Sequence, residues 1–240
     1  MNHITIGNKK NPVVVFLHGW GGSIDSWGLI PATIASYGFW SVVVDLPGFG
    51  KSAEPTRSMC VLDYVNELKD LLDELCVKEC VIVGHSFGGR VAIKFSSIYK
   101  QMVSKLVLVD SAGIKPRRGL MYRYKVWAYK RAKRLVNKGV KPESLLKKYG
   151  SDDYRALGPQ MRATFIRVVN EDLSCDARRI ECDTLLVWGQ NDKSTPLYMA
   201  KKLRKMIKRS RLEIYVAGHF SYLECVDRFI SEIYIFILSG

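Results

Sequence analysis

The chain has 240 residues, 48% hydrophobic and 25% charged, which is ordinary for one soluble globular domain with room for a modest insertion. No apolar run approaches the ~18–20 residues needed to cross a bilayer, so the sequence predicts no transmembrane helix. The formal net charge of +14 is unusual for a small soluble chain, and it raises anionic small molecules, nucleic acid and acidic membrane surfaces as partners.

The first residues and the cysteines predict a cytoplasmic protein. Residues Met1–Thr5 lack the charged region followed by an apolar region that begins a signal peptide. The spacing of the cysteines matches no common zinc site, and we expect all of them to be reduced, mostly buried thiols: Cys60, Cys76, Cys80, Cys175, Cys182 and Cys225.

Two kinds of apolar pattern alternate along the chain, short continuous runs and longer stretches with helical spacing. Continuous runs suit the strands of a parallel sheet, which is covered on both faces. The predicted strands are Val13–Leu17, Trp40–Asp45, Cys80–Val83, Lys105–Asp110, Thr184–Trp188 and Arg211–Val216. The predicted helices are Val61–Leu75, Phe87–Tyr99, Pro196–Met206 and Tyr222–Leu238. This alternation predicts an α/β fold with right-handed crossovers and a doubly wound, mostly parallel sheet.

One segment interrupts the alternation. Residues 113–179 show no convincing strand, and their pattern is helical, basic and aromatic, as in Met121–Trp127. We interpret 113–179 as a helical cap inserted between the two parts of a core, 1–112 and 180–240.

The sharpest chemical signal is the sequence Gly84–Gly89 (GHSFGG), which follows a predicted strand and opens the next helix. The pattern G-x-S-x-G alone is weak, since roughly one chain in ten of this length would contain it by chance. Its setting is informative, because a tight strand-to-helix turn strains the serine backbone and its small neighbours prevent a collision. Ser86 would then project from the carboxyl edge of the sheet, beside a helix N-terminus that favours developing negative charge. The alternative is a glycine-rich turn with a bystander serine.

A serine hydroxyl needs a neighbouring base before it can act as a nucleophile. Of the four histidines, His219 fits best, because it follows the last predicted strand at the same edge of the sheet, beside a glycine. His3 lies near the terminus, His85 sits in the turn and would point away from the serine hydroxyl, and His18 belongs to another motif. The alternative for His219 is a histidine in a surface loop.

The acid that orients the histidine is expected at the end of a neighbouring strand. Asp192 directly follows such a strand and is our first choice, and Asp110, at the end of the preceding strand, is the alternative. Asp45 also ends a strand, but on the other side of the sheet, so we interpret it as structural. The order of Ser86, Asp192 and His219 along the chain is the order expected with this serine motif.

A second glycine-rich loop, His18–Gly22 (HGWGG), follows the predicted strand Val13–Leu17. Backbone N–H groups in such a loop can stabilise an oxyanion. The donors that we expect are the amides of Trp20 and Phe87, and each such donor is typically worth about 3 kcal/mol of transition-state stabilisation.

Together these motifs resemble the α/β-hydrolase fold superfamily, and within it the large group of single-domain hydrolases with a helical cap. The resemblance covers nearly the whole chain outside the cap and rests on His18–Gly22, Asp45–Ser52, Gly84–Gly89, Trp188–Asp192 and Gly218–His219. These motifs are specific for the fold and for a Ser-His-Asp triad. They are poorly specific for substrate, because the superfamily includes esterases, lipases, thioesterases, C–C bond hydrolases, peptidases and non-enzymatic receptors.

The sequence also departs from related patterns. Members of this group usually begin with two antiparallel strands, whereas about a dozen residues precede Val13 here, so we expect a shortened N-terminal part of the sheet. A serine at position 86 argues against haloalkane dehalogenases and epoxide hydrolases, which use an aspartate there. Neither Gly50–Ser52 nor Gly19–Gly21 completes a nucleotide-binding motif, so we expect no cofactor and no metal.

The positive charge is concentrated in the predicted cap. Residues 113–172 contain 16 basic and 5 acidic residues, a net +11 of the total +14. The simplest interpretation is a solvated outer face of the cap helices. The alternatives are a pocket that attracts a carboxylate- or phosphate-bearing substrate, and docking on an anionic membrane or on nucleic acid.

The resemblance predicts a serine hydrolase that cleaves carboxylic esters of small or medium acyl groups through an acyl-enzyme, with Ser86 as nucleophile, His219 as base and Asp192 as the orienting acid. The predicted pocket residues are Gly19, Trp20, Phe87, Phe220 and Trp127. The alternatives are a C–C bond hydrolase or lyase-like enzyme acting on an acidic substrate, and a non-enzymatic ligand receptor. We expect a monomer or homodimer whose partner is a small-molecule ester rather than nucleic acid, and we do not favour membrane contact through the cap.

Overall fold

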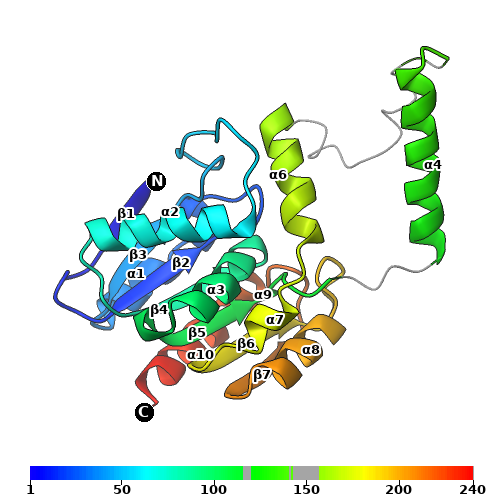
Figure 1. Cartoon of the computed structure of the whole chain (residues 1–240). Coiled ribbons are helices and arrows are strands. Elements are labelled where there is room, and N and C mark those ends of the chain that lie inside the picture. The colour runs from blue at the N-terminus through cyan, green and yellow to red at the C-terminus, as the bar shows by residue number, and fades with distance from the viewer. Residues whose placement is uncertain (116–119, 141, 143–156, 240) are drawn as a thin grey trace.

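A computed structural model describes residues 1–115, 120–140, 142 and 157–239 (Figure 1). At its centre is a seven-stranded sheet with the strand order β1-β3-β2-β4-β5-β6-β7. β1 runs antiparallel to β3, and the other neighbouring strands run parallel. The strands are β1 (His3–Ile6), β2 (Val13–Leu17), β3 (Trp40–Val44), β4 (Cys80–His85), β5 (Val103–Val109), β6 (Asp183–Gly189) and β7 (Ser210–Tyr215).

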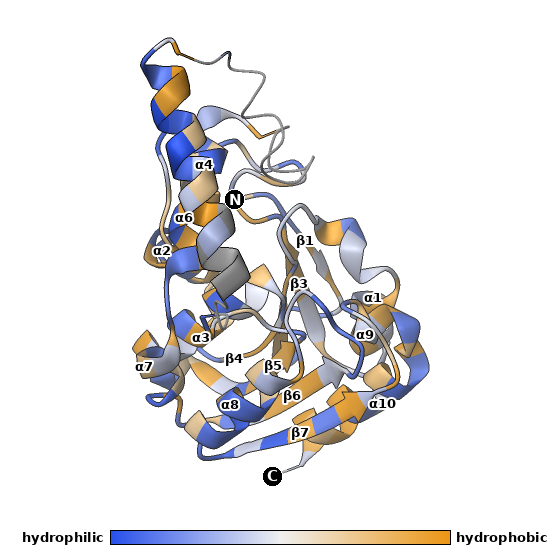
Figure 2. Ribbon diagram, turned by 90° about the vertical axis from the view of Figure 1, so that its right-hand side faces the viewer, coloured by the Kyte–Doolittle hydropathy of each residue, from blue (hydrophilic) through white to orange (hydrophobic). Residues whose placement is uncertain are grey.

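Helices cover both faces of this sheet (Figure 2). The first and last helices, α1 and α10, pack on one face, and α2, α3 and α8 pack on the other. The helices of the core are α1 (Ile30–Ser36), α2 (Val61–Glu74), α3 (Phe87–Ile98), α8 (Tyr198–Met206), α9 (Ser221–Glu224) and α10 (Val226–Leu238), with short 3-10 turns at Ile24–Trp27 and Lys100–Met102.

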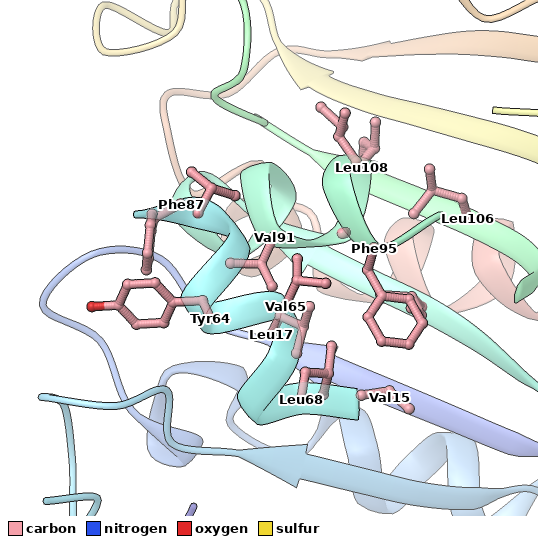
Figure 3. Close-up of a cluster of buried hydrophobic side chains, with 14 of the residues drawn as sticks. Val15, Leu17, Tyr64, Val65, Leu68, Phe87, Val91, Phe95, Leu106 and Leu108 are labelled. Atoms are coloured by element: carbon pink, nitrogen blue, oxygen red, sulfur yellow. The ribbon is translucent and has the colours of Figure 1, made fainter. Parts of the chain in front are cut away.

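The strands are continuous apolar runs because both of their faces are buried. Along β2, Val14 and Phe16 belong to the core under α1 and α10, whereas Val15 and Leu17 belong to the core under α2 and α3. Figure 3 shows this second core, in which side chains of α2 and α3, such as Val91, meet those of the sheet. The alternation follows from the two-residue period of a strand, and it fixes the carboxyl ends of the parallel strands along one edge.

The predicted fold class is confirmed, and one antiparallel strand, β1, precedes β2. Each of the six predicted strands is present, with ends that differ by one or a few residues. The sequence did not predict β1 or α1. β1 is a four-residue edge strand with two exposed side chains, and α1 has seven residues, so neither is long enough for a clear apolar period.

The predicted cap lies in the segment between β5 and β6. Its described residues form α4 (Leu120–Asn137), α6 (Pro159–Asn170) and α7 (Ser174–Ala177), and no strand occurs among them. α6 packs on the core through Met161 and Val168, and the Thr164 hydroxyl accepts the Met59 N–H at 2.9 Å. α4 stands away from the sheet (Figure 1). The boundaries of the cap at 113–179 stay a prediction, and the basic residues of 116–119, 141 and 143–156 lie outside the described residues.

Within the described part of the chain, no helix combines the length and apolar character that a membrane span requires.

Candidate active site

Ser86 occupies the turn between β4 and α3. Its φ of +48° lies in the left-handed region that residues other than glycine rarely adopt, so the backbone is strained there. The Ser86 N–H donates to the Val109 carbonyl and the Ser86 carbonyl accepts the Ala112 N–H, both at 3.0 Å. A Cβ at Gly88 would lie 2.1 Å from the carbonyl oxygen of Leu17, so glycine is required for α3 to approach β2 this closely. The surrounding sheet thus holds the strained serine at its carboxyl edge.

The three side chains that the sequence singled out for catalysis meet at this edge. His219 Nε2 lies 3.0 Å from Ser86 Oγ, and His219 Nδ1 lies 2.8 Å from Asp192 Oδ2. A carboxylate oxygen can only accept, so Nδ1 carries the proton and Nε2 is left with a lone pair that faces the serine hydroxyl. This geometry can make a serine hydroxyl nucleophilic.

Both oxygens of the Asp192 carboxylate accept hydrogen bonds. Oδ1 accepts the N–H groups of Ser194 and Thr195 at 2.7 and 3.0 Å, and Oδ2 accepts the Thr195 hydroxyl at 2.6 Å in addition to the His219 ring. Burial alone would raise the pKa of Asp192, but the hydrogen bonds from His219 and Thr195 outweigh it and hold the pKa below its ordinary value. Asp192 is therefore ionised at neutral pH and fixes the tautomer of His219.

The loop that carries His219 is held by groups on both sides. His85 Nε2 donates to the His219 carbonyl at 2.9 Å, and the Gly218 N–H donates to the Glu224 carboxylate at 3.0 Å. Burial lowers the pKa of His85 to about 3, so its ring stays neutral and serves as a fixed donor. The two imidazole rings lie side by side, with 5.0 Å between their centroids.

Asp110, the alternative acid, binds residues on either side of this loop, Gly189 at the end of β6 and Ser221 at the start of α9. Its Oδ1 accepts the Gly189 N–H at 2.7 Å, and its Oδ2 accepts the N–H and the hydroxyl of Ser221 at 3.1 and 2.6 Å. Burial raises the pKa of Asp110 to about 7 in spite of these hydrogen bonds. The structure therefore places Asp192 against the His219 ring, and it places Asp110 where it ties β6 to the start of α9.

The glycine-rich loop after β2 is held by its own buried histidine. His18 Nδ1 donates to the Gly19 carbonyl at 2.7 Å, and His18 Nε2 accepts the Leu46 N–H at 3.0 Å. Burial lowers the pKa of His18, which keeps the ring neutral and able to donate at one nitrogen and accept at the other. A Cβ at Gly19 would lie 3.3 Å from Ser86 Cβ, so this loop passes directly over the serine.

The two predicted oxyanion donors belong to neighbouring segments. Phe87 is the first residue of α3, and the N–H groups in the first turn of a helix have no intrahelical partner. The rings of Trp20 and Phe87 pack edge to face with 5.2 Å between their centroids.

Asp45, which the sequence marked as structural, accepts the N–H groups of Ile24 and Lys51 and the side-chain amide of Asn2, at 2.7, 2.8 and 2.6 Å.

A cavity of about 570 Å³ lies beside Ser86. Four of the five predicted pocket residues line it, namely Gly19, Trp20, Phe87 and Phe220. α6 contributes one apolar wall through Phe165, Val168 and Val169, while Ile114 and Met199 add to the apolar lining.

Trp127, the fifth predicted pocket residue, is not part of this lining. It lies on α4 with 54% of its surface exposed, 5.9 Å from the ring of Tyr124 and 5.5 Å below the guanidinium of Arg131. The prediction assumed that the aromatic side of this helix faces the serine, whereas the structure holds α4 away from the sheet (Figure 1).

Four basic side chains of α4 are described, and they are exposed to solvent: Lys130, Arg131, Lys133 and Arg134. None of these four lines the cavity, so their charge lies on an outer face of the helix. One arginine does line the cavity, and it comes from the core rather than the cap. Arg90, on α3, is 4% exposed, and burial lowers its pKa to about 10, so the guanidinium is still charged at neutral pH.

A doubly wound sheet with a strained serine between a strand and a helix, under a glycine-rich loop and beside an inserted cap, defines the α/β-hydrolase class of proteins. Comparison with protein families agrees, because the model of the alpha/beta hydrolase family matches residues 14–232. The chain belongs to this family, as its motifs predicted.

Similar proteins include both of the enzyme types considered above. An esterase from Exiguobacterium antarcticum superposes with a TM-score of 0.77 at 23% identity, over 99% of this chain and 95% of that one. A meta-cleavage product hydrolase from Pseudomonas fluorescens has a TM-score of 0.73 at 21% identity, over 98% and 93%. A 2-hydroxy-6-oxononadienedioate/2-hydroxy-6-oxononatrienedioate hydrolase from Pseudomonas putida is 28% identical, over 95% of this chain and 88% of the relative.

Several residues of the site carried no clear signal in the sequence. Ser194 and Thr195 follow Asp192 by two and three residues, a spacing typical of an Asx turn, which could have identified them. Arg90 follows Ser86 by four residues, in the helix that opens at Phe87, and both Ser86 and Arg90 line the cavity. Among the described residues, no three His, Cys, Asp or Glu side chains gather as metal ligands would.

Proposed function

We propose that the protein is a serine hydrolase that cleaves carboxylic esters of small or medium acyl groups. The observation that carries this proposal is the hydrogen-bonded chain from Ser86 Oγ to His219 Nε2 at 3.0 Å, and from His219 Nδ1 to Asp192 Oδ2 at 2.8 Å. The largely apolar cavity beside the serine is of a size that fits such an acyl group.

In this mechanism Ser86 Oγ attacks the ester carbonyl while His219 Nε2 takes the hydroxyl proton. The new Oγ–C bond produces a tetrahedral oxyanion, and the imidazolium that forms is stabilised by the ionised Asp192. When the intermediate collapses, the C–O bond to the alcohol breaks and His219 returns the proton to the leaving oxygen. A water molecule then repeats the cycle on the acyl-enzyme and releases the acid and the free serine.

The oxyanion would be held by the amides of Trp20 and Phe87. Phe87 begins α3, so the positive end of the helix dipole adds to the effect of its N–H. The His18 side chain holds the loop through the carbonyl of Gly19, so the Trp20 amide is oriented before the substrate binds.

A second candidate is the hydrolysis of a C–C bond in an acidic substrate. Arg90 is the observation that favours it, because a cation in the cavity suits a carboxylate-bearing compound. The Pseudomonas relative is named for such a reaction on a dienedioate. The same serine and histidine would serve, since both reactions place negative charge on a carbonyl oxygen.

The decisive assay is a series of p-nitrophenyl esters from acetate to palmitate, compared between the protein and Ser86→Ala. We expect turnover of the short and medium esters and a loss of at least about 10³-fold in Ser86→Ala, since the serine forms the covalent intermediate. Turnover only of a 2-hydroxy-6-oxo dienoate, followed by loss of its visible absorbance, would favour C–C cleavage. Tight binding of these compounds without turnover would favour a receptor and contradict the proposal.

A further inference from the structure

The cavity beside Ser86 contains a buried positive charge that the proposed chemistry does not use. Arg90 lies in the first half of α3, four residues after Ser86. Both residues line the same cavity.

The hydrogen bonding of Arg90 is incomplete. A guanidinium has five N–H donors. In the described structure one hydrogen bond is made, from Nη1 to the backbone carbonyl of Glu171 at 2.8 Å. A buried charge is costly unless it is paired, and a carbonyl oxygen supplies only part of the compensation.

The acidic side chains near Arg90 are committed to other groups. The Glu171 carboxylate accepts Lys94 at 3.2 Å and the Val61 N–H at 3.3 Å. The Asp176 carboxylate accepts Lys94 at 3.3 Å and the Ser97 hydroxyl at 3.2 Å. Among the described residues, no carboxylate lies within ion-pair distance of the Arg90 guanidinium, and the charges of Glu171 and Asp172 favour its charged form from further away.

The rest of the described lining is uncharged on the side of α6. Arg90 is the sole Lys or Arg among the described lining residues, and α6 adds the apolar side chains of Phe165, Val168 and Val169. A largely apolar cavity with one cation suits an amphiphilic compound with a single anionic end. The acyl group is the part of an ester that stays on the serine in both half-reactions, so a cation in this cavity can act on it throughout the cycle.

We propose that Arg90 is a specificity-determining residue that binds a carboxylate on the acyl chain of the substrate, so that the preferred substrates are half-esters of short dicarboxylic acids or related acidic acyl compounds. This inference rests on the proposed function for the bond that is cleaved. An acid of glutarate size, bracketed by succinate and adipate, provides the test series.

The test compares p-nitrophenyl hydrogen glutarate with its methyl ester, which has the same chain and no charge. We expect the protein to prefer the acid by at least about tenfold in kcat/KM, and Arg90→Gln to lower this ratio by about 10- to 100-fold, as expected for a lost hydrogen-bonded charge pair. Arg90→Lys should recover part of the ratio. Lys94→Gln removes a cation from the same Glu171 and Asp176 cluster outside the cavity, and it should leave the ratio unchanged.

Two outcomes would overturn the inference. One is a preference for the neutral ester. The other is an Arg90→Gln variant that lowers kcat/KM for both esters equally, which a purely structural role would produce.

A binding experiment separates this inference from the proposed function. If neither ester is turned over, the proposed function fails, but the subsite can still be measured by titrating methyl hydrogen glutarate into Ser86→Ala by calorimetry. The inference predicts binding that weakens at least about tenfold when Arg90→Gln is added to this background. Equal affinity in the two variants would contradict it.

Discussion

Replacing Asp192 with asparagine tests how the site sets the proton of His219. The Ser194 and Thr195 N–H groups both point at Oδ1, so the asparagine oxygen must take the Oδ1 position. The new NH₂ group then occupies the Oδ2 position, 2.8 Å from His219 Nδ1. Two donors cannot face each other, so Nδ1 must become an acceptor and Nε2 must carry the proton toward Ser86. The variant thus keeps the geometry and loses the base.

The magnitude follows from this tautomer. A histidine with the wrong tautomer in a serine hydrolase lowers kcat on the order of 10³- to 10⁴-fold, roughly 4–5.5 kcal/mol of transition-state stabilisation. The fold should survive, because the Thr195 hydroxyl can accept from the new amide and donate to the Asp110 carbonyl, 2.9 Å away. The assay is kcat on p-nitrophenyl butyrate together with Tm. Asp176→Asn, at a buried carboxyl on α7, is the control and should keep kcat within about twofold of the parent. A kcat of Asp192→Asn within tenfold of the parent would mean that Asp192 does not set the tautomer of His219.

Three further predictions concern Gly88 in the turn after Ser86, Asp110 between β6 and α9, and Trp127 on α4. Gly88→Ala places a Cβ 2.1 Å from the Leu17 carbonyl oxygen, so we expect a Tm lower by at least about 5 °C, and an unchanged Tm in a thermal melt would be inconsistent with the packing described. Asp110 binds its proton more tightly when folded, with a pKa of about 7, so the free energy of unfolding should fall by up to a few kcal/mol as the pH rises from about 4 to 7. Urea titrations should show this fall relative to Asp110→Asn, and parallel curves would contradict it. Trp127→Ala should leave kcat/KM for short esters within about twofold of the parent, because Trp127 does not line the cavity. A tenfold loss would show that Trp127 contacts the substrate.

The clear apolar patterns of the sequence predicted most of the sheet and of the helices that cover it. Runs such as Val13–Leu17 are apolar at every position because the sheet is covered on both faces, and the structure places strands there. The strand β1 was missed because its contribution is backbone pairing with β3 at the edge of the sheet, which leaves little trace in side-chain pattern.

The parts of the site that the sequence could place are those with a local signature. Ser86, His219 and Asp192 each follow a strand, so the shared carboxyl edge of a parallel sheet was enough to bring them together. The sequence favoured Asp192 but kept Asp110 as the alternative, because both end neighbouring strands; the loop paths of the structure bring the Asp192 carboxylate to the imidazole.

The cap was harder to predict, because a basic and aromatic helix does not reveal which neighbour its apolar side contacts. The sequence placed Trp127 in the pocket, whereas the cavity wall comes from α6, whose Phe165 ring packs 5.0 Å from that of Trp20. A charged pocket was an alternative interpretation of the basic cap, whereas the arginine that lines the cavity, Arg90, belongs to α3.

Labelling with a fluorophosphonate shows whether Ser86 is the activated nucleophile that its contact with His219 indicates. We expect a stoichiometric adduct, mapped by peptide mass spectrometry to Ser86, that is lost in Ser86→Ala and strongly slowed in His219→Ala because the base is gone. Folded protein that stays unlabelled at Ser86 would mean that this serine is not activated.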